Sequence, residues 1–378
     1  MSQKRINLLT LISYKFLPAK LGGHIAHLYF HNYISAYLNP IVAGSVDNKD
    51  KSDLNFKLIQ VFDRKEINPY IPFSYFFKLR KIVKENKIDI IMCSHPYLGI
   101  TAYFLSLICS IPMVLYSHNI ESDRFKSMGK WWAPILYQYE KWVMHRASKI
   151  FFVAKEDLIW AERNYNLPME KLVVSPFGIN MTEKPVKLYS NKLNLINTYN
   201  LNTKDKFLYF AGSYDYQPNI DAVKFILDEI FPKLSLRLEN FTILIIGKGL
   251  NQNIVERINL TNGKIVYLGF VENIRWVLDS ADIMLNPMLS GGGIKTKAVE
   301  ALGNNIKVVS TENGAGGLDR GVCGGMLMIS PDNKWEQFVE NIIISSNSNA
   351  EIHKEFYEFY AWENETKRVA EEMLSLVL

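Results

Sequence analysis

Residues 283–303 read IMLNPMLSGGGIKTKAVEALG, and this stretch contains the pattern that decides the fold. The apolar run 283–286 predicts a buried strand, because strands covered on both faces of a parallel sheet are continuously apolar. Gly291, Gly292 and Gly293 then form a loop, and a helix is expected to begin a few residues later. A strand, a glycine-rich loop and a helix in this order are typical of a parallel α/β unit.

The same alternation of short apolar strands and helical stretches continues through almost the whole chain. It predicts parallel sheets with right-handed crossover connections. Two groups of strands predict an α/β fold with two separate doubly wound units. In the first group we expect strands over residues 6–13, 58–62, 88–93, 113–116, 149–153 and 172–174, and in the second over 206–211, 242–246, 264–268, 283–286 and 307–310.

A change of composition separates the two groups of strands. Residues 189–206 contain five asparagines and no clear hydrophobic period, which is typical of a connection. We therefore expect an N-terminal Rossmann-like domain over residues 1–185, a linker over 186–205 and a C-terminal Rossmann-like domain over 206–354.

The composition of the 378-residue chain excludes several classes of protein. With 48% hydrophobic and 21% charged residues, it fits neither a disordered chain nor a collagen-like repeat. The net charge of +5 is too weak over this length to predict nucleic-acid binding. Cys93, Cys109 and Cys323 match no metal-binding spacing, so we expect free thiols and a reducing, cytoplasmic location.

Two apolar stretches imitate membrane-directed segments. Residues 6–12 follow Lys4 and Arg5 as in a short signal peptide, but no small-residue cleavage site follows them, so a first strand is expected. Residues 90–120 contain no Asp, Glu, Lys or Arg and are long enough to span a bilayer. Prolines and glycines interrupt this stretch, and we expect a strand, a helix over 99–109 and another strand instead.

A third stretch leaves two interpretations open. Aromatic residues over 71–77 are followed by five basic residues up to Lys87, and Trp131-Trp132 lies further along the chain. Basic residues with aromatic neighbours can place a helix on an anionic membrane surface. The alternative is a core-facing helix with a solvated basic side.

The glycine-rich stretch 291–293 is also where chemistry is expected. Glycines at the start of a helix let backbone N–H groups approach an anion, and the helix dipole favours negative charge there. Lys295 adds a full positive charge, and the carboxylate of Glu300 is able to accept both hydroxyls of a ribose. A diphosphate and a ribose form the core of a nucleotide sugar. The alternative is an ordinary strand–helix joint in which the glycines only allow tight packing.

Two further patterns are weaker. Gly247-Lys248-Gly249 follows an apolar strand as in a dinucleotide-binding fingerprint, but Gln252 stands where the third glycine belongs, so an NAD site is weakly indicated. His24, His27 and His31 share one helical face. Metal ligation is one interpretation of this face, and we favour a helix surface beside a glycine loop.

Five motifs in the second half of the chain appear in an order that resembles one enzyme family. They lie over residues 212–219, 246–249, 268–271, 290–300 and 309–318. This order closely resembles the retaining glycosyltransferases of family four. The resemblance implies the GT-B fold, with two facing Rossmann-like domains, a parallel sheet in each and a cleft between them.

The first half of the chain and its C-terminus resemble the same family. Gly22-Gly23 resembles its glycine-rich loop after the first strand, and residues 117–121 resemble its histidine-bearing loop. Residues 176–179 resemble its segment before the linker. Trp362-Glu363 resembles its C-terminal motif, which implies that about 355–378 form a helix joining the N-terminal domain. The resemblance assigns the acceptor to the N-terminal domain and the donor to the C-terminal domain.

The resemblance also implies a set of site residues. His118 would bind the donor sugar or orient the acceptor, Lys295 would bind phosphate, and Glu300 would bind the ribose. The first glutamate of the family's usual pair falls at Gly292, and the usual Arg and Lys are absent near 212–219, so Lys295 is the substitute cation. The implied donor- and nucleotide-binding residues are Gly22, Gly23, Gly212, Ser213, Gly247, Lys248, Val271, Gly291, Gly292, Gly293, Ile294 and Thr296.

Together these features predict a retaining glycosyltransferase. It would move a sugar from a UDP- or GDP-sugar to a hydroxyl of a surface-glycan or lipid-linked acceptor, and the departing phosphate would take the hydroxyl proton. No Asp-x-Asp occurs, so we expect neither a metal nor another cofactor. The expected partners are the nucleotide sugar, the acceptor and a peripheral contact with the inner face of the membrane, but no nucleic acid. The alternatives are an NAD-dependent oxidoreductase or epimerase, and a non-catalytic glycan- or nucleotide-binding relative.

Overall fold

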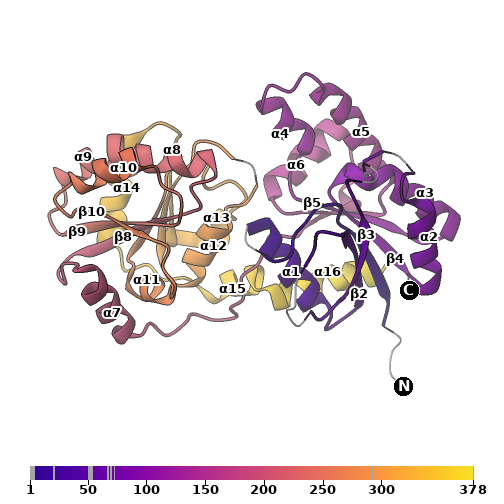
Figure 1. Cartoon of the computed structure of the whole chain (residues 1–378), viewed down its shortest axis with the longest axis horizontal. Coiled ribbons are helices and arrows are strands. Elements are labelled where there is room, and N and C mark those ends of the chain that lie inside the picture. Colours follow the sequence, from indigo (N-terminus) through magenta and orange to yellow (C-terminus); the bar gives the residue numbers. More distant parts are fainter. Residues whose placement is uncertain are drawn as a thin grey trace. The chain divides into compact units, whose positions relative to one another are not determined.

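The computed structural model describes residues 5–19, 22–49, 54–65, 68, 70–71, 73–291 and 293–377. The chain divides into two compact units, which are both visible in Figure 1. The N-terminal unit comprises Met1–Asn180 together with Tyr360–Leu378, and the C-terminal unit comprises Met181–Phe359. The last stretch of the chain therefore belongs to the N-terminal unit.

A parallel sheet forms the centre of the N-terminal unit, and seven of its strands are described, in the order β3-β2-β1-β4-β5-β6-β7. The side chains of β4 and β5 are buried along the whole strand, because helices cover both faces of a parallel sheet. The strands are β1 (Asn7–Leu11), β2 (Asn39–Ser45), β3 (Lys57–Phe62), β4 (Ile90–Ser94), β5 (Met113–Ser117), β6 (Lys149–Phe152) and β7 (Leu172–Val174).

The helices of the N-terminal unit include one from the far end of the chain. Helix α16 packs against α1 (Figure 1). The indole of Trp362 meets the ring of Phe30 edge-on, with the ring centres 6.5 Å apart. The helices are α1 (Gly22–Ile34), α2 (Phe76–Glu85), α3 (Gly99–Cys109), α4 (Glu121–Ser127), α5 (Ala133–Arg146), α6 (Lys155–Tyr165) and α16 (Trp362–Leu374), with the 3-10 turns η1 (Pro96–Leu98) and η2 (Met169–Lys171).

Two passages of the chain meet where it leaves the N-terminal unit and returns to it. The N–H of Ile179 donates to the carbonyl oxygen of Tyr360 at 2.8 Å, and the N–H of Trp362 donates to the carbonyl oxygen of Ile179 at 3.0 Å. A Cβ on Gly178 would lie 2.7 Å from the same Tyr360 oxygen. A glycine is therefore required for the two passages to approach this closely.

The C-terminal unit is built on a second parallel sheet, in which six strands are described, in the order β10-β9-β8-β11-β12-β13. Figure 1 shows α8, α9 and α10 on one side of this sheet and α7 and α11 on the other. The strands are β8 (Lys206–Ala211), β9 (Phe241–Ile246), β10 (Ile265–Gly269), β11 (Ile283–Asn286), β12 (Lys307–Thr311) and β13 (Leu327–Ser330).

The helices of the C-terminal unit complete its two outer layers. The segment between α8 and α9 is a π-helix, η3, and α15 leads out of this unit. The elements are α7 (Tyr189–Tyr199), α8 (Gln217–Phe225), η3 (Ile226–Ile230), α9 (Phe231–Ser235), α10 (Gln252–Asn259), α11 (Arg275–Ser280), α12 (Thr296–Gly303), α13 (Arg320–Cys323), the 3-10 turn η4 (Gly324–Met326), α14 (Trp335–Asn347) and α15 (Lys354–Tyr360).

The predicted α/β fold with two parallel sheets is confirmed, with three local differences. The segment predicted as an irregular linker contains helix α7, which packs against α11 and buries Leu195 and Ile196. Strands β2 and β13 were not predicted. Strand β2 begins with Asn39-Pro40, a pair typical of turns, and β13 is only four residues long after two glycines.

Residues 90–120 fold as the sequence predicts, into β4, η1, α3 and β5. In the described part of the chain, no helix combines the length and apolar character needed to cross a bilayer. The thiols of Cys93 and Cys323 are buried and that of Cys109 is partly buried, and all three are free.

Candidate functional site

Each sheet has a point at which the strand order reverses. In the N-terminal sheet this point lies between β1 and β4, and in the C-terminal sheet it lies between β8 and β11. In open α/β sheets, the connections leave such strands toward opposite faces, and ligands bind beyond the carboxyl ends of the strands. The turns that follow these strands therefore define the candidate site of each unit.

Two glycines bring the turns after β8 and β9 into contact. Gly247 has φ +133°, and a Cβ on it would lie 1.8 Å from the carbonyl oxygen of Gly212. The N–H of Gly212 donates to Ile246 at 3.0 Å, and the N–H of Gly247 donates to Gly269 at 2.8 Å. The strand ends β8, β9 and β10 are thus joined edge to edge, and the predicted residues Gly212 and Gly247 lie together.

Three other predicted residues lie on these turns. The hydroxyl of Ser213 donates to Asp215 at 3.3 Å, and its carbonyl oxygen accepts from the Asn219 side chain at 2.8 Å. Lys248 is exposed, with its ammonium 4.3 Å from the centre of the Phe270 ring. Val271 is buried just after β10. All three residues therefore border the carboxyl edge of the sheet.

The glycine loop after β11 adopts backbone conformations that favour glycine. Gly291 has φ +99° and Gly293 has φ +68°, while Gly292 lies outside the described residues. Ile294 is buried and lies against Gly317, on which a Cβ would be 3.0 Å from that side chain. Thr296 is the first residue of α12. The N-cap residue is Lys295, and its side chain makes no capping hydrogen bond to the helix. The helix dipole at this end therefore favours an anion.

Lys295 lies inside this loop. Its ammonium donates to the carbonyl oxygens of Gly291 at 2.8 Å and Gly293 at 2.9 Å. Burial lowers the pKa of the ammonium to about 8. The predicted phosphate-binding cation therefore stabilises the glycine loop in this structure and adds positive charge to its base.

Lys297, which no sequence motif singled out, is a second partly buried lysine at the start of α12. Its ammonium donates to the carbonyl oxygen of Ala211 at 3.2 Å and to Oδ1 of Asn219 at 3.1 Å, and it lies 4.1 Å from the centre of the Phe210 ring. These partners are all uncharged. Burial, and then the charge of Lys295, lower the pKa of Lys297 to about 7. The only signal in the sequence was a second lysine two residues after the first.

Glu300 lies in the second turn of α12 with an exposed side chain. The surrounding protein raises the pKa of its carboxyl group by desolvation, and the positive charge of Arg275 opposes that change. Burial raises the pKa of the Tyr209 phenol on β8, and the negative charge of Glu300 raises it further, so the two side chains lie close together. Glu300 is thus placed at the same switch point as Lys297, one turn further along the helix.

The predicted residues of the N-terminal unit follow β1 and β5. Gly22 and Gly23 are the first two residues of α1. His118 is buried after β5, with Nε2 3.2 Å from the hydroxyl of Ser94 and its ring stacked on His95 at 4.2 Å. Burial, with smaller contributions from neighbouring imidazoles, holds the pKa of His118 well below its ordinary value. His118 is therefore a neutral imidazole.

The prediction that His27 and His31 lie on a helix surface is wrong. Both are buried in α1, because this face of the helix packs on the sheet beside β1. Nδ1 of His31 donates to the carbonyl oxygen of His27 at 2.7 Å, and Nε2 lies 3.0 Å from the hydroxyl of Thr10. In the described part of the chain, no group of His, Cys, Asp or Glu side chains has the arrangement of a metal site.

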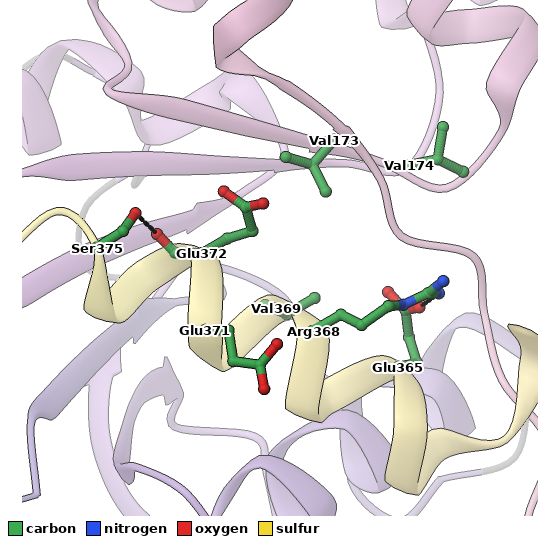
Figure 2. A pocket seen from close by; sticks show the side chains of 8 residues that line it. All are labelled: Val173, Val174, Glu365, Arg368, Val369, Glu371, Glu372 and Ser375. Carbon is green, nitrogen blue, oxygen red and sulfur yellow. Dashed lines mark hydrogen bonds and ion pairs between the residues drawn. The ribbon is translucent and has the colours of Figure 1, made fainter. Parts of the chain in front are cut away.

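A separate cavity of about 360 Å³ lies in the N-terminal unit between β7 and α16, and Figure 2 shows its lining. Three carboxylates and one guanidinium line it, so its charge does not suit a diphosphate. The lining residues are Val173, Val174, Glu365, Arg368, Val369, Glu371, Glu372 and Ser375.

Comparisons with known proteins match both units. The family model described as Glycosyltransferase Family 4 matches residues 41–183, and the one described as Glycosyl transferases group 1 matches residues 205–346. An uncharacterized 44.6 kDa protein in the cps region of Klebsiella pneumoniae is 22% identical over 272 residues, which is 68% of this chain. The matched region spans 65% of that relative's length, slightly less than two thirds.

Solved structures share the arrangement of elements over nearly the whole chain. The Anabaena protein Alr3699/HepE in complex with UDP has a TM-score of 0.74 at 15% identity, covering 98% of this chain and all of that one. Further structures of HepE contain UDP with glucose, or UDP-glucose. WaaG, a glycosyltransferase involved in lipopolysaccharide biosynthesis, has a TM-score of 0.62 at 14% identity, covering 97% of each chain.

The architecture, with one doubly wound parallel sheet in each unit, places the protein in the GT-B class of fold. The family models then narrow the assignment from a class of fold to a family, because one model matches in each half of the chain. The two models together cover most of the chain, which therefore belongs to the group 1 glycosyltransferases, as the sequence motifs predicted; the retaining mechanism stays a prediction.

Proposed function

We propose that the protein is a retaining glycosyltransferase that takes a sugar from a UDP- or GDP-sugar. One observation carries this proposal. At the β8/β11 switch point, the ammonium of Lys297 is partly buried against uncharged partners, next to a glycine loop and an uncapped helix N-terminus. A buried charge is stable only when it is paired, so this site favours an anion such as a diphosphate. HepE, which has the same fold, binds UDP and UDP-glucose.

The proposed mechanism follows from where negative charge develops. As the bond between the anomeric carbon and the phosphate oxygen breaks, the electron pair stays on the nucleoside diphosphate. Amides at the start of α12, with Lys295 and Lys297, would stabilise this charge, and each preorganised donor is worth about 3 kcal/mol of barrier. The acceptor oxygen bonds to the same face of the sugar, and its proton passes to the departing phosphate oxygen. The configuration is therefore retained without a covalent intermediate.

Other residues would bind the remaining parts of the two substrates. Glu300 would accept the ribose hydroxyls, as its exposed carboxylate one turn beyond the lysines allows. His118 would donate or accept a hydrogen bond to the sugar as a neutral imidazole. We propose no metal and no other cofactor, because the lysines and the helix dipole supply the positive charge that a metal would otherwise provide.

The proposed acceptor is a surface glycan or a lipid-linked glycan. WaaG, which shares the fold, acts in lipopolysaccharide biosynthesis. On the N-terminal unit, the side chains of Phe77 and Trp131 are each 82% exposed. Helix α2 buries Leu79, Ile82 and Val83 and exposes Lys78, Lys81 and Lys84, which agrees with a core-facing helix and leaves a basic surface for anionic lipid.

A donor screen tests the proposed function. The protein is incubated with a panel of UDP- and GDP-sugars, nucleotide release is measured, and NMR identifies the anomer formed from the active donor. We expect release from at least one donor, with the anomeric configuration kept, and loss of release in Lys297→Met. Binding of NAD without any nucleotide would favour the oxidoreductase alternative, and nucleotide binding without turnover would favour a non-catalytic relative.

A further inference from the structure

His95 stands directly after β4, at the switch point of the N-terminal sheet. Its backbone has φ +69° and ψ +158°, a conformation that only glycine adopts without strain. The peptide N–H of His95 still donates to Tyr116 at 3.1 Å, so the strand pairing continues up to this residue. Strained backbone of this kind persists where the surroundings hold it, and it concentrates at functional sites. The side chain of His95 is therefore held in a particular place.

The carboxylate of Glu121 lies beside the imidazole of His95. Nδ1 of His95 lies 3.2 Å from Oε1 of Glu121, in an orientation outside that of a normal hydrogen bond. The Glu121 side chain is 1% exposed, whereas that of His95 is 13% exposed. The imidazole thus lies between a buried carboxylate and the accessible surface of the unit.

Glu121 is fixed and ionised. Its Oε2 accepts from the Tyr97 hydroxyl at 2.6 Å and from the Arg124 guanidinium at 2.6 Å. Burial alone would raise the pKa of Glu121, but His95, Arg124 and Tyr97 together lower it to about 2. An ionised carboxylate beside Nδ1 favours the tautomer with hydrogen on Nδ1. Nε2 of His95 is then left as a hydrogen-bond acceptor.

The groups around Nε2 are polar and uncharged. The hydroxyl of Tyr14 lies 3.3 Å from this nitrogen and 2.6 Å from Nε2 of His27. The hydroxyl of Ser94 lies 3.2 Å from Nε2 of His118 and 3.3 Å from Nε2 of His27. Burial holds the pKa of both His27 and His118 well below the ordinary value, so both imidazoles are neutral. This lining suits the hydroxyl groups of a sugar better than it suits an anion.

We propose that His95, oriented by Glu121, binds the acceptor in the N-terminal unit through a hydrogen bond from an acceptor hydroxyl to Nε2. The proposal rests on the proposed function and extends it to the acceptor. His95 accepts a hydrogen bond from a hydroxyl beside the one that attacks. When water replaces the acceptor, His95 accepts a hydrogen bond from the O–H of water that stays on the sugar product. The other proton still leaves with the diphosphate, so the transfer step is unchanged. Glu121 is a positioning residue, because it acts only through His95.

Donor hydrolysis tests this proposal without knowledge of the natural acceptor. The rate of nucleotide release is measured with water as the only acceptor. The donor is the nucleotide sugar that the unmodified protein hydrolyses fastest. We expect His95→Phe to lower kcat at least tenfold with the donor KM changed less than twofold, since the residues proposed to bind the diphosphate and the ribose lie in the C-terminal unit. His95→Gln keeps an acceptor oxygen and is expected to recover part of the rate. His353→Phe, at an exposed histidine of the C-terminal unit, is the matched control and is expected to hydrolyse normally.

A variant that removes the backbone strain separates binding from folding. His95→Gly is expected to lose hydrolysis to the same extent as His95→Phe, while its thermal midpoint stays at or above that of the unmodified protein. If the thermal midpoint of His95→Gly falls and its loss of hydrolysis is explained by that loss of stability, His95 has a structural role and the proposal is overturned. Normal hydrolysis by His95→Phe would overturn it as well.

The orientation by Glu121 is measured independently of activity. In ¹⁵N-histidine NMR spectra of the full chain, we expect His95 to carry hydrogen on Nδ1 and to change toward the other tautomer in Glu121→Gln. Hydrogen on Nε2 in the unmodified protein would overturn the proposal. Absence of turnover with every nucleotide sugar would instead contradict the proposed function, and the tautomer measurement would still decide the role of Glu121.

Discussion

At the carboxyl ends of β8 and β11, the C-terminal unit presents glycine turns and two partly buried ammonium groups, those of Lys295 and Lys297. At the carboxyl ends of β1 and β4, the N-terminal unit presents imidazoles, the phenol of Tyr14 and the buried carboxylate of Glu121. The two sheets reverse their strand order in the same way. The residues of the turns at these two points differ.

We infer from this difference that one topology can serve two kinds of ligand. The switch point of a parallel sheet provides the location, and the charge left unpaired in the turns determines what binds there. In the C-terminal unit, the ammonium of Lys297 has no carboxylate among its described contacts. In the N-terminal unit, a carboxylate is already neutralised by Arg124, and neutral hydrogen-bonding groups remain. We infer that the first arrangement favours an anion and the second a sugar hydroxyl.

The largest expected effect is at Gly247, where the glycine turn of the C-terminal unit is most crowded. In Gly247→Ala, the new Cβ would lie 1.8 Å from the Gly212 carbonyl oxygen at φ +133°, so the turn has to rearrange. We expect the free energy of unfolding to fall by at least about 3 kcal/mol and UDP binding to be lost. Urea unfolding and calorimetric titration with UDP measure both.

Gly263→Ala is the matched control for this change. Gly263 also has positive φ, +78°, but a Cβ on it would meet nothing within 4 Å. We expect a loss of about 1 kcal/mol with UDP binding kept. Equal losses at Gly247 and Gly263 would show that backbone conformation alone matters and that the contact between the two turns does not.

Glu121 gives the next largest effect, and it concerns the N-terminal unit. The folded state lowers the pKa of this carboxyl from its ordinary value of 4.5 to about 2. A lowered pKa contributes stability that is present above pH 4.5 and is lost as the pH falls toward 2, here about 3 kcal/mol. Glu121→Gln should therefore show a flatter decline of stability in urea between pH 5 and pH 2. Glu85→Gln, at an exposed carboxylate of α2, should decline as the unmodified protein does.

Lys297→Met tests the unpaired positive charge of the C-terminal unit. Removing the ammonium should weaken UDP binding by about 2 kcal/mol, because hydrogen bonds to charged groups are worth this much. At pH 7 the variant should unfold no more easily than the unmodified protein, since methionine fills the site without a buried charge. Lys224→Met removes a lysine that pairs with Asp221 on the surface of α8 and should leave UDP binding unchanged. A Lys297→Met protein with normal UDP affinity would contradict the proposed diphosphate site.

The smallest expected effect is on the pH dependence of UDP binding. Lys295 and Lys297 have pKa values lowered to about 8 and about 7, so both lose most of their charge between pH 7 and pH 9. A bound diphosphate favours their charged forms and raises both pKa values, so binding takes up protons between pH 7 and pH 9. UDP affinity should fall about tenfold over this range, or about 1.4 kcal/mol. Calorimetry in buffers of different ionisation enthalpy measures the proton uptake, and an uptake of zero at pH 8 would contradict the role of the lysines.

The sequence was sufficient for those parts of the fold that depend on local pattern. The strands over 206–211 and 283–286 and the helix over 99–109 were predicted with the observed bounds, because each is a strongly apolar run with clear breakers. Helix α7 was missed because asparagines hide its period, and packing against α11 stabilises it. Tertiary contacts of this kind override local propensity.

The candidate site was predictable where backbone conformation requires glycine. Gly247, Gly291 and Gly293 all have positive φ, which a sequence motif can indicate directly. The choice between Lys295 and Lys297 was not predictable, since it depends on which direction each side chain takes from the start of α12. His95 was not predictable either, because its partner Glu121 lies beyond the next strand and only the fold brings them together.

The two chain passages at Ile179 and Ala361 have a consequence for how the protein is made. A ribosome completes residues 181–359 before it releases α16, which carries Trp362, Val369 and Met373 into the core of the N-terminal unit. The C-terminal unit is thus the first to have all of its residues available. We therefore expect the N-terminal unit, although its sheet is translated first, to become complete only after α16 has been added to it.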